Sequence, residues 1–413
     1  LKTYIMKIMV SMPHLLHYFN LTLNKVNEIP GVELVVLIPK ELDVMVAGGG
    51  INQTRENVKF RIFELNEFKI GHYYSFKGIA KLLRKEKPNI ILCSDEFMYA
   101  YILSFPLWIT MKIFNIKLIM QSNLYQIPHY KDAFRRFGKE PNRIDKLPRL
   151  LRFIVVNFGI EYFLRRGRAY INKLIYNRPD AHLVYIDEAY SVYGSYGVAE
   201  EKIFVTDNST DTDLLAQTEI SIEGLPRILP PSSNRVLHVG RLTKWKRVDL
   251  LIQSTARLKN DFPNIELVII GEGPELESLQ ALANSLGIKE YVRFVGGVYD
   301  ADELARYFKA SSIYVLAGKG GLSINEAMFY GLPIICSVCD GTEKKLVRDG
   351  FNGSIFEEGS EEDLVEKISI ILGDEELQKN MSKNSKMIIN KEINIHTVLE
   401  KWKEGFDYVL SKK

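Results

Sequence analysis

A cluster of cations follows a short apolar run in the second half of the chain. The strand-like sequence RVLHVG leads into GRLTKWKR, so that Gly240 begins a turn and Arg241, Lys244, Lys246 and Arg247 follow it. Open α/β sheets bind ligands at the carboxyl ends of their strands. Cations beside a helix N-terminus are suited to a diphosphate. The pattern therefore predicts a diphosphate site, and the alternative is a solvated helix start with scattered cations.

Two glycine-containing loops follow other apolar runs. One run ends in Gly271-Glu272-Gly273-Pro274, and another, Ile313–Leu316, leads into a loop that contains Gly320 and Gly321. Glycines there allow backbone N–H groups to approach a phosphate at the start of a helix. The first loop is also compatible with an ordinary turn.

Glu326 stands one turn into the helix that we expect to begin near Ser323. Ser323-x-x-Glu326 has the spacing of a capping box, which would account for the glutamate without any ligand. Against that alternative, a glycine-rich loop beside a cationic loop is more than a helix cap requires.

Polar candidates in the first half also follow apolar runs. His14 stands after the first run, and Asp95 and Glu96 stand after PNIILCS, where a general base or an acceptor contact could lie. Asn123 belongs to a third group, Gln121-Ser122-Asn123. The alternatives are a capped loop histidine and a helix N-terminus enriched in acids.

Composition excludes several protein classes. The 413 residues predict two to three domains, and 46% apolar with 25% charged residues is typical of a globular protein. A net charge of +3 is too small for a surface built to bind nucleic acid, and three cysteines exclude a disulfide framework. Asp211-x-Asp213, the sequence closest to a metal-binding Asp-x-Asp, is not beside a strand end, so we expect neither a metal nor a cofactor.

Short Val/Ile/Leu runs alternate with amphipathic helical patterns, which indicates α/β architecture with parallel sheets. The Pro/Ser-rich stretch 224–234 indicates a linker. We expect a Rossmann-like first domain at 1–220, a linker at 221–233, a second domain at 234–392 and a final helix at 393–413.

Residues 129–178 are unusually basic. Thirteen Lys and Arg stand against four Asp and Glu, around the mostly apolar stretch LPRLLRFIVVNFGIEYFL. Such a segment suits an interfacial helix on an anionic membrane, and a core helix with basic ends is the equal alternative. We expect a cytoplasmic protein, with peripheral association at the cytoplasmic face of the membrane under the first alternative.

In their order, the motifs HVGRLTKWKRVDLLI, VIIGEGPE, VRFVGGV, GGLSINEAMFYGLPIICS and LVRDGFNG resemble the C-terminal domain of GT-B glycosyltransferases, specifically glycosyltransferase family 4. The resemblance spans about residues 236 to 353, and the first half matches more loosely. It implies two Rossmann-like domains facing across a cleft, with the final helix crossing back to the first domain. It also implies a metal-independent, retaining transfer from a nucleotide sugar.

The resemblance also implies roles for individual residues. Arg241 and Lys246 would neutralise the donor diphosphate, and Glu326 would hold the ribose hydroxyls. The remaining donor contacts lie in the three loops: Gly240, Gly271, Gly273, Lys319, Gly320, Gly321 and Leu322. First-domain contacts to the acceptor or sugar would come from His14, Asp95, Glu96 and Asn123.

One position departs from the family. Where members place a first Glu that contacts the donor sugar, this chain has Gly318, followed by Lys319. Either Lys319 replaces that contact or it is a solvated loop residue. We expect a glycosyltransferase that uses a UDP- or GDP-sugar and a glycan or lipid-linked acceptor. The alternatives are an epimerase of the same fold and an inactive sugar-nucleotide-binding homologue.

Overall fold

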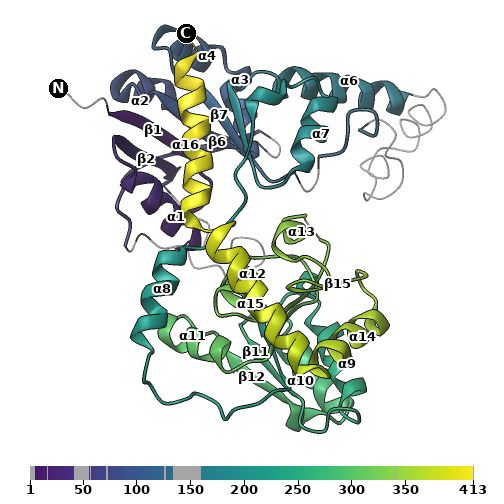
Figure 1. Ribbon diagram of the computed structural model, residues 1–413. Helices are drawn as coiled ribbons and strands as arrows, with labels where there is room; N and C mark the ends of the chain where they lie inside the picture. The colour runs from purple at the N-terminus through teal and green to yellow at the C-terminus, as the bar shows by residue number, and fades with distance from the viewer. Residues whose placement is uncertain are drawn as a thin grey trace.

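The computed structural model describes residues 5–15, 17–40, 55, 57–70, 73–124, 127–133, 160–339 and 341–412. They form two domains, each built on a parallel sheet with helices on both faces (Figure 1). The expected fold class is confirmed. Much of the basic segment 129–178 lies outside the described residues, and only 129–133 and 160–178 can be placed.

The first sheet has the order β3-β2-β1-β6-β7-β8-β9, and its paired strands are all parallel. The strands are β1 (Met6–Ser11), β2 (Val32–Pro39), β3 (Arg61–Leu65), β6 (Ile90–Ser94), β7 (Lys117–Ser122), β8 (Ala181–Val184) and β9 (Ile203–Val205). A separate antiparallel pair, β4 (Glu67–Ile70) and β5 (Tyr73–Phe76), follows β3.

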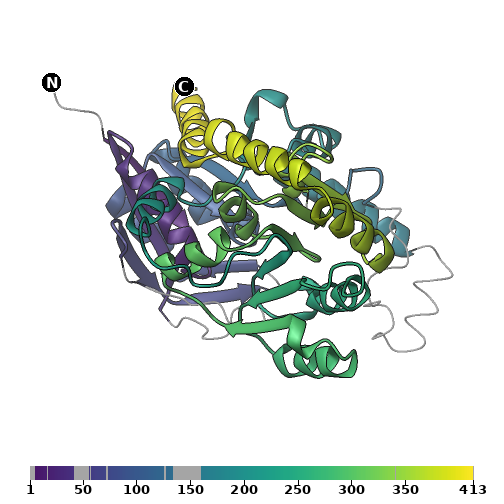
Figure 2. The same ribbon diagram turned by 60° about the horizontal axis from the view of Figure 1, so that its bottom comes forward.

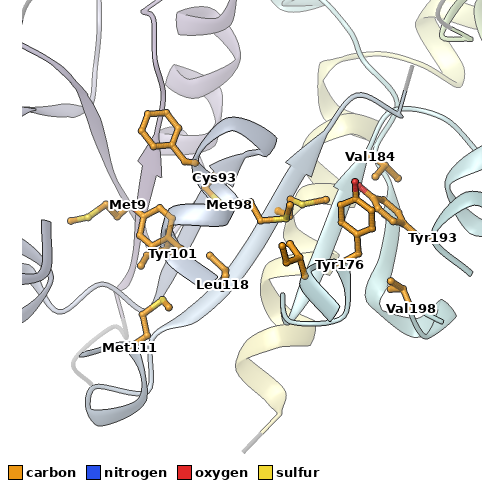
Figure 3. Packing of buried hydrophobic residues seen from close by; sticks show 14 of the residues in the cluster. Met9, Cys93, Met98, Tyr101, Met111, Leu118, Tyr176, Val184, Tyr193 and Val198 are labelled. Atoms are coloured by element: carbon orange, nitrogen blue, oxygen red, sulfur yellow. The ribbon is translucent and has the colours of Figure 1, made fainter. Parts of the chain in front are cut away.

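Side chains alternate along these strands and form two apolar layers. Met9, Ile91 and Cys93 belong to one core cluster, together with residues of five helices (Figure 3). These helices are α2 (Ile79–Glu86), α3 (Asp95–Leu103), α4 (Phe105–Ile113), α6 (Ile160–Tyr176) and α7 (Glu188–Ser195). Ile8 and Val10 face the other layer, which α1 (His17–Glu28) and the last helix cover.

The second sheet has the order β12-β11-β10-β13-β14-β15, again with every pair parallel. Its strands are β10 (Arg235–Val239), β11 (Glu266–Ile270), β12 (Val292–Gly296), β13 (Ile313–Leu316), β14 (Ile334–Ser337) and β15 (Gly353–Phe356). One face packs against α11 (Ala301–Lys309), α12 (Ser323–Phe329) and α15 (Glu375–Lys391). The other packs against α9 (Val248–Leu258), α10 (Leu276–Ser285) and α14 (Glu361–Leu372). The remaining helices are α8 (Thr212–Ser221), α13 (Glu343–Leu346), and the 3-10 turns Glu200–Lys202, Lys244–Lys246 and Lys289–Tyr291.

The last helix, α16 (Ile395–Ser411), returns from the second domain to the first, as expected (Figures 1 and 2). The Asn394 side chain accepts hydrogen bonds from the N–H groups of His396 and Thr397 and so caps its start. Trp402 and Phe406 are buried in the α1-side core of the first domain. The apolar stripe of α16 therefore fixes its position across the first sheet.

Candidate functional site

Three loops meet at the carboxyl edge of the second sheet. They follow β11, β10 and β13, which are neighbours in the sheet, and comprise residues 271–275, 240–247 and 317–322. The edge of an open parallel sheet is where ligands bind. The loops that the sequence singles out are thus brought together.

The β10 and β11 loops continue the parallel pairing beyond the strand ends. The Leu242 N–H donates to the Glu272 carbonyl at 2.9 Å, and the Glu275 N–H donates to the Leu242 carbonyl at 3.1 Å. A Cβ at Gly271 would lie 1.9 Å from the Gly240 oxygen, and one at Gly273 would lie 2.3 Å from the Leu242 oxygen. Both positions also have positive φ, at 148° and 158°, so they require glycine.

Lys246 joins the β10 loop to the β13 loop. Its ammonium donates to the carbonyls of Lys319 and Gly320, both at 2.8 Å. A Cβ on Gly321 would lie 3.3 Å from the same nitrogen. The cation is therefore held against the glycine-rich loop that precedes α12.

Gly318 makes the approach of these two loops possible. A Cβ at this position would lie 2.2 Å from the Trp245 oxygen and 2.6 Å from the Lys246 carbonyl carbon. The next N–H, of Lys319, donates to that Trp245 oxygen at 2.9 Å. The Lys319 side chain is exposed. Any residue larger than glycine at 318 would push the β13 loop away from Lys246.

Arg241 lies on the β10 loop, as Lys246 does, and is half-buried. Its guanidinium carbon is 5.8 Å from the centre of the Trp245 ring, within cation–π range. Gly240 precedes it directly after β10, and Leu322 is the last residue before α12. The structure thus places Lys246 between the end of β10 and the loop before α12, and Arg241 on the same β10 loop.

Glu326 does not form the capping box that the sequence allows. The Ser323 hydroxyl instead accepts a 2.7 Å hydrogen bond from Tyr314, and the start of α12 has no side-chain cap. The capping alternative is therefore wrong. Burial raises the pKa of Glu326 to about 7. Such a carboxyl is typical of a group that meets a ligand or takes up a proton near neutral pH.

His238 is a site residue that the sequence interpretation missed. It is fully buried near the end of β10, where Nδ1 lies 3.1 Å from the Val315 carbonyl. Burial, with Lys246 nearby, lowers the pKa of His238 to about 4, so the ring is neutral. Its Nε2 has no hydrogen-bond partner among the described residues and would lie 3.5 Å from a Cβ at Gly240. A histidine within an otherwise apolar strand was the available signal.

The first-domain candidates follow β1, β6 and β7, which are adjacent strands. His14 is half-buried, Asn123 is exposed, and Asp95 and Glu96 form the first turn of α3. The acid-rich helix start is therefore confirmed as their location. Burial, followed by the nearby Glu96, raises the pKa of Asp95 to about 7. The buried Asp95 Oδ1 has no hydrogen-bond partner among the described residues.

Paired hydroxyls lie near these candidates and were also missed. Ser11 at the end of β1 is 2.6 Å from the Tyr101 hydroxyl, and Ser122 at the end of β7 is 2.6 Å from the Tyr193 hydroxyl. These pairs make the carboxyl end of the first sheet polar although its strands are apolar. Serine at a strand end is too common a feature to have predicted them.

The carboxyl edges of the two sheets face each other. Lys345 of α13 pairs with Asp187 and Asp207, which follow β8 and β9, at 3.0 and 2.8 Å. Lys344 pairs with Glu188 at 2.7 Å, and Asn325 of α12 donates to the Asn208 carbonyl at 3.1 Å. The loops of the second domain and the polar edge of the first are therefore parts of one region. Elsewhere, Asp211 caps α8 and Asp213 pairs with Lys25 and His396.

A family model now accounts for the second domain. Residues 227–387 match the model described as Glycosyl transferases group 1. The second domain is therefore similar to group 1 glycosyltransferase domains. The match contains Arg241, Lys246, Gly318 and Glu326, so all the second-domain candidates lie within the group 1 region.

Similar proteins share part of the chain. An uncharacterised glycosyltransferase of Haemophilus influenzae is 31% identical over 193 residues, which are 45% of this chain and 54% of that protein. An uncharacterised glycosyltransferase of Methanocaldococcus jannaschii is 30% identical over 182 residues, 43% of this chain and 46% of that protein. The alpha-monoglucosyldiacylglycerol synthase of Acholeplasma laidlawii is 30% identical over 152 residues, 36% and 37% of the two chains. The chain thus spans about half the length or less of these curated relatives.

Solved structures extend the likeness to both domains. Anabaena Alr3699/HepE, crystallised with UDP, superposes with a TM-score of 0.67 at 16% identity and covers 97% of this chain and 99% of its own. A glycosyltransferase from Rickettsia africae gives a TM-score of 0.67 at 15% identity and covers all of both chains. At this identity the likeness shows the fold, which is GT-B.

Proposed function

We propose that this chain is a metal-independent, retaining glycosyltransferase that moves a sugar from a UDP- or GDP-sugar to a glycan or lipid-linked acceptor. The product would belong to a surface polysaccharide or another glycoconjugate. The second domain would bind the donor and the first domain the acceptor, because the two sheets face each other through their carboxyl edges.

The observation that carries the proposal is the position of Lys246. Two carbonyls of the β13 loop fix its ammonium within the group 1 domain. Held there, the ammonium would lie beside a diphosphate bound at the glycine-rich loop before α12. Together with Arg241 it would stabilise the negative charge that develops when the nucleoside diphosphate leaves. One preorganised donor of this kind contributes roughly 2.7–4 kcal/mol to transition-state stabilisation.

The similar proteins support the substrate classes. Anabaena Alr3699/HepE was crystallised with UDP, and the name of the Acholeplasma laidlawii relative indicates a glycolipid product. Glu326, with its elevated pKa, would accept hydrogen bonds from the ribose hydroxyls once it is ionised. Asp95 would contact the acceptor hydroxyl from the opposite domain, as a general base or by hydrogen bonding.

Product analysis tests the proposal against its alternatives. The protein is incubated with radiolabelled UDP-glucose or GDP-mannose and a panel of glycan and lipid-linked acceptors. We expect label to appear in an acceptor, with release of the nucleoside diphosphate. Isomerised sugar nucleotide without an acceptor product would identify an epimerase. Binding of UDP or GDP in a thermal-shift assay with no turnover on the panel would favour the inactive homologue.

A further inference from the structure

The outer surface of α4 carries large apolar side chains in contact with solvent. Leu103, just before α4, is 66% exposed, Phe105 is 67% exposed and Ile113 is 70% exposed. Trp108 is partly exposed, and its ring centre lies 6.1 Å from that of Phe105. Large apolar residues that gather on one exposed helix indicate an interaction surface.

The neighbouring helix α2, which packs against α4, presents cations. Lys81, Arg84 and Lys85 are exposed on α2, and Lys77 and Lys87 flank it. The acid of this stretch, Glu86, is turned inward to Lys7 and Arg61, and its side chain is 8% exposed. The outward charge of α2 is therefore uniformly positive.

Helix α6 extends the same surface. Like α2 and α4 it covers the core that contains Tyr101, and it exposes Tyr170, Ile171 and Leu174 together with Arg166 and Arg168. A pocket of about 220 Å³ lies where α4 meets the residues that follow α6. Its lining includes Trp108, Met111 and Lys112 on one side and Asn177 and Arg178 on the other. We call the exposed residues of α2, α4 and α6 named here the basic-apolar face.

We propose that the basic-apolar face docks on an anionic phospholipid bilayer. Apolar and aromatic side chains beside a continuous set of Lys and Arg are what an anionic lipid surface attracts: the rings enter the interface and the cations meet the headgroups. The exposed charges named on this face are all positive, and that sign is complementary to an anionic lipid surface. Within the described residues, no helix has the length and apolar character needed to cross a bilayer. Docking would be peripheral.

The cations of α2 lie outside the basic stretch 129–178 noted in the sequence, whereas Arg166 and Arg168 of α6 belong to it. This inference rests on the proposed function in one respect, namely that the acceptor is lipid-linked. Docking would keep the first domain beside the membrane in which such an acceptor lies. Vesicle binding itself needs no turnover, so it can be measured independently.

The test is co-sedimentation of the full chain with vesicles of phosphatidylcholine alone or mixed with phosphatidylglycerol, at low and high salt. We expect the protein to pellet with the anionic vesicles and to be partly released by salt. Lys81→Glu/Arg84→Glu/Lys85→Glu should weaken partitioning on the order of a hundredfold or more, because each basic residue near such a surface adds about one kcal/mol. Phe105→Ser/Ile113→Ser should weaken binding that persists at high salt.

Matched variants elsewhere should bind like the wild type. Lys379→Glu/Lys383→Glu/Lys391→Glu makes the same change of net charge on α15, and Ile220→Ser/Ile370→Ser removes exposed isoleucines of 71% and 48% exposure. An equal loss of vesicle binding in these control variants would overturn the inference. Wild-type protein that stays in the supernatant with anionic vesicles would overturn it too. So would oligomers that Phe105→Ser/Ile113→Ser dissociates, because the face would then bind a second copy. If vesicles bind but no sugar is transferred, the proposed function fails and the docking surface stands.

Discussion

At the scale of single residues, Lys246 is distinguished from its neighbours by its contacts. Its ammonium is fixed by two carbonyls, whereas Lys244 on the same turn is exposed. Lys246→Ala should lower turnover by about 10²–10³, the cost of losing one preorganised donor at a developing charge. Lys244→Ala is the matched control and should retain most activity. The measurement is steady-state kinetics with the sugar nucleotide that labels an acceptor in the product analysis, alongside melting temperature. An active Lys246→Ala enzyme would refute the donor-site assignment.

Gly318 leads to a prediction opposite to the one that the family resemblance suggests for this position. Introducing glutamate, the residue that family members carry, should reduce activity, because its Cβ would lie 2.2 Å from the Trp245 oxygen and force the β13 loop away from Lys246. Gly318→Ala should already impair turnover. Gly194→Ala, where a Cβ would meet no atom within 4 Å, is the control. Turnover and UDP or GDP affinity are measured on all three. Higher activity in Gly318→Glu would show that the loop adjusts and that the sugar contact was missing.

Glu326 predicts how nucleotide binding depends on pH. Its pKa of about 7 means that the carboxylate forms only as the pH rises through that value. If the carboxylate holds the ribose, wild-type affinity for UDP or GDP should increase across this range, up to about tenfold per pH unit below the pKa. Glu326→Gln should lose that component. Calorimetric binding measurements on both proteins isolate the contribution of Glu326, because the protonation of the diphosphate itself affects both proteins alike. Identical profiles would contradict the ribose role.

The same pKa has a consequence for stability. An acid whose pKa is raised by folding binds its proton more tightly in the folded than in the unfolded state. The free energy of unfolding of the ligand-free protein should therefore fall as the pH rises from the ordinary glutamate range through about 7. Asp95 contributes with the same sign, so Glu326→Gln should flatten only part of the slope. Denaturant titrations at several pH values measure this.

At the scale of elements, apolar runs predicted most strands because parallel strands are buried on both faces. The run Ile313–Leu316 has the ends that the structure gives to β13. The apolar pattern missed β15, whose GSIF contains a glycine and a serine, and the β4–β5 pair, which lies outside the main sheets. The capping box suggested by the Ser323-x-x-Glu326 spacing does not form, because the Ser323 hydroxyl accepts a hydrogen bond from Tyr314 of β13. This contact depends on the tertiary structure, so the spacing could not predict it.

Helix α16 contributes stability to a domain distant from it in sequence. Trp402 is 1% exposed in the first-domain core, and a Cβ on Gly405 would lie 2.8 Å from Leu183 of β8. Trp402→Ala should cost about 3–5 kcal/mol through lost burial and the cavity left behind. We expect the first-domain melting transition to fall by several degrees in calorimetry. Lys403→Ala, an exposed change on the same helix, should leave it in place. An unchanged transition in Trp402→Ala would mean that α16 is not needed there.

At the scale of the whole molecule, the second-domain candidates could be predicted because their motifs are continuous in sequence. Gly240, Gly271 and Gly320 follow strands that are adjacent in one sheet, so the sheet topology brings these motifs together. The structural role of Gly318 and the burial of His238 depend on how two loops approach each other, which no single motif contains. The contacts between the domains join residues more than a hundred positions apart and were not predicted.

Those contacts lead to a prediction about the arrangement of the domains. Although burial opposes its charge, hydrogen bonds to Asp207 and Asp187 raise the pKa of Lys345, and the hydrogen bond from Lys344 lowers the pKa of Glu188. Each such pair contributes roughly 0.2–1 kcal/mol, so the three pairs would shift the equilibrium between closed and open arrangements up to roughly a hundredfold. Reversing both lysines, Lys344→Glu/Lys345→Glu, replaces this attraction with repulsion and should separate the two edges.

Small-angle X-ray scattering should then give a larger radius of gyration, and turnover should fall because the proposed function places donor and acceptor on opposite domains. Affinity for UDP or GDP should change little, since in the proposed function the second domain would hold the nucleotide by itself. Adding Asp187→Lys/Glu188→Lys restores opposite charges and should recover both the scattering and the turnover. The control is Lys379→Glu/Lys383→Glu, which makes the same charge change on α15. If the α13 variant scatters and turns over like this control, the ion pairs are not what keeps the two edges together.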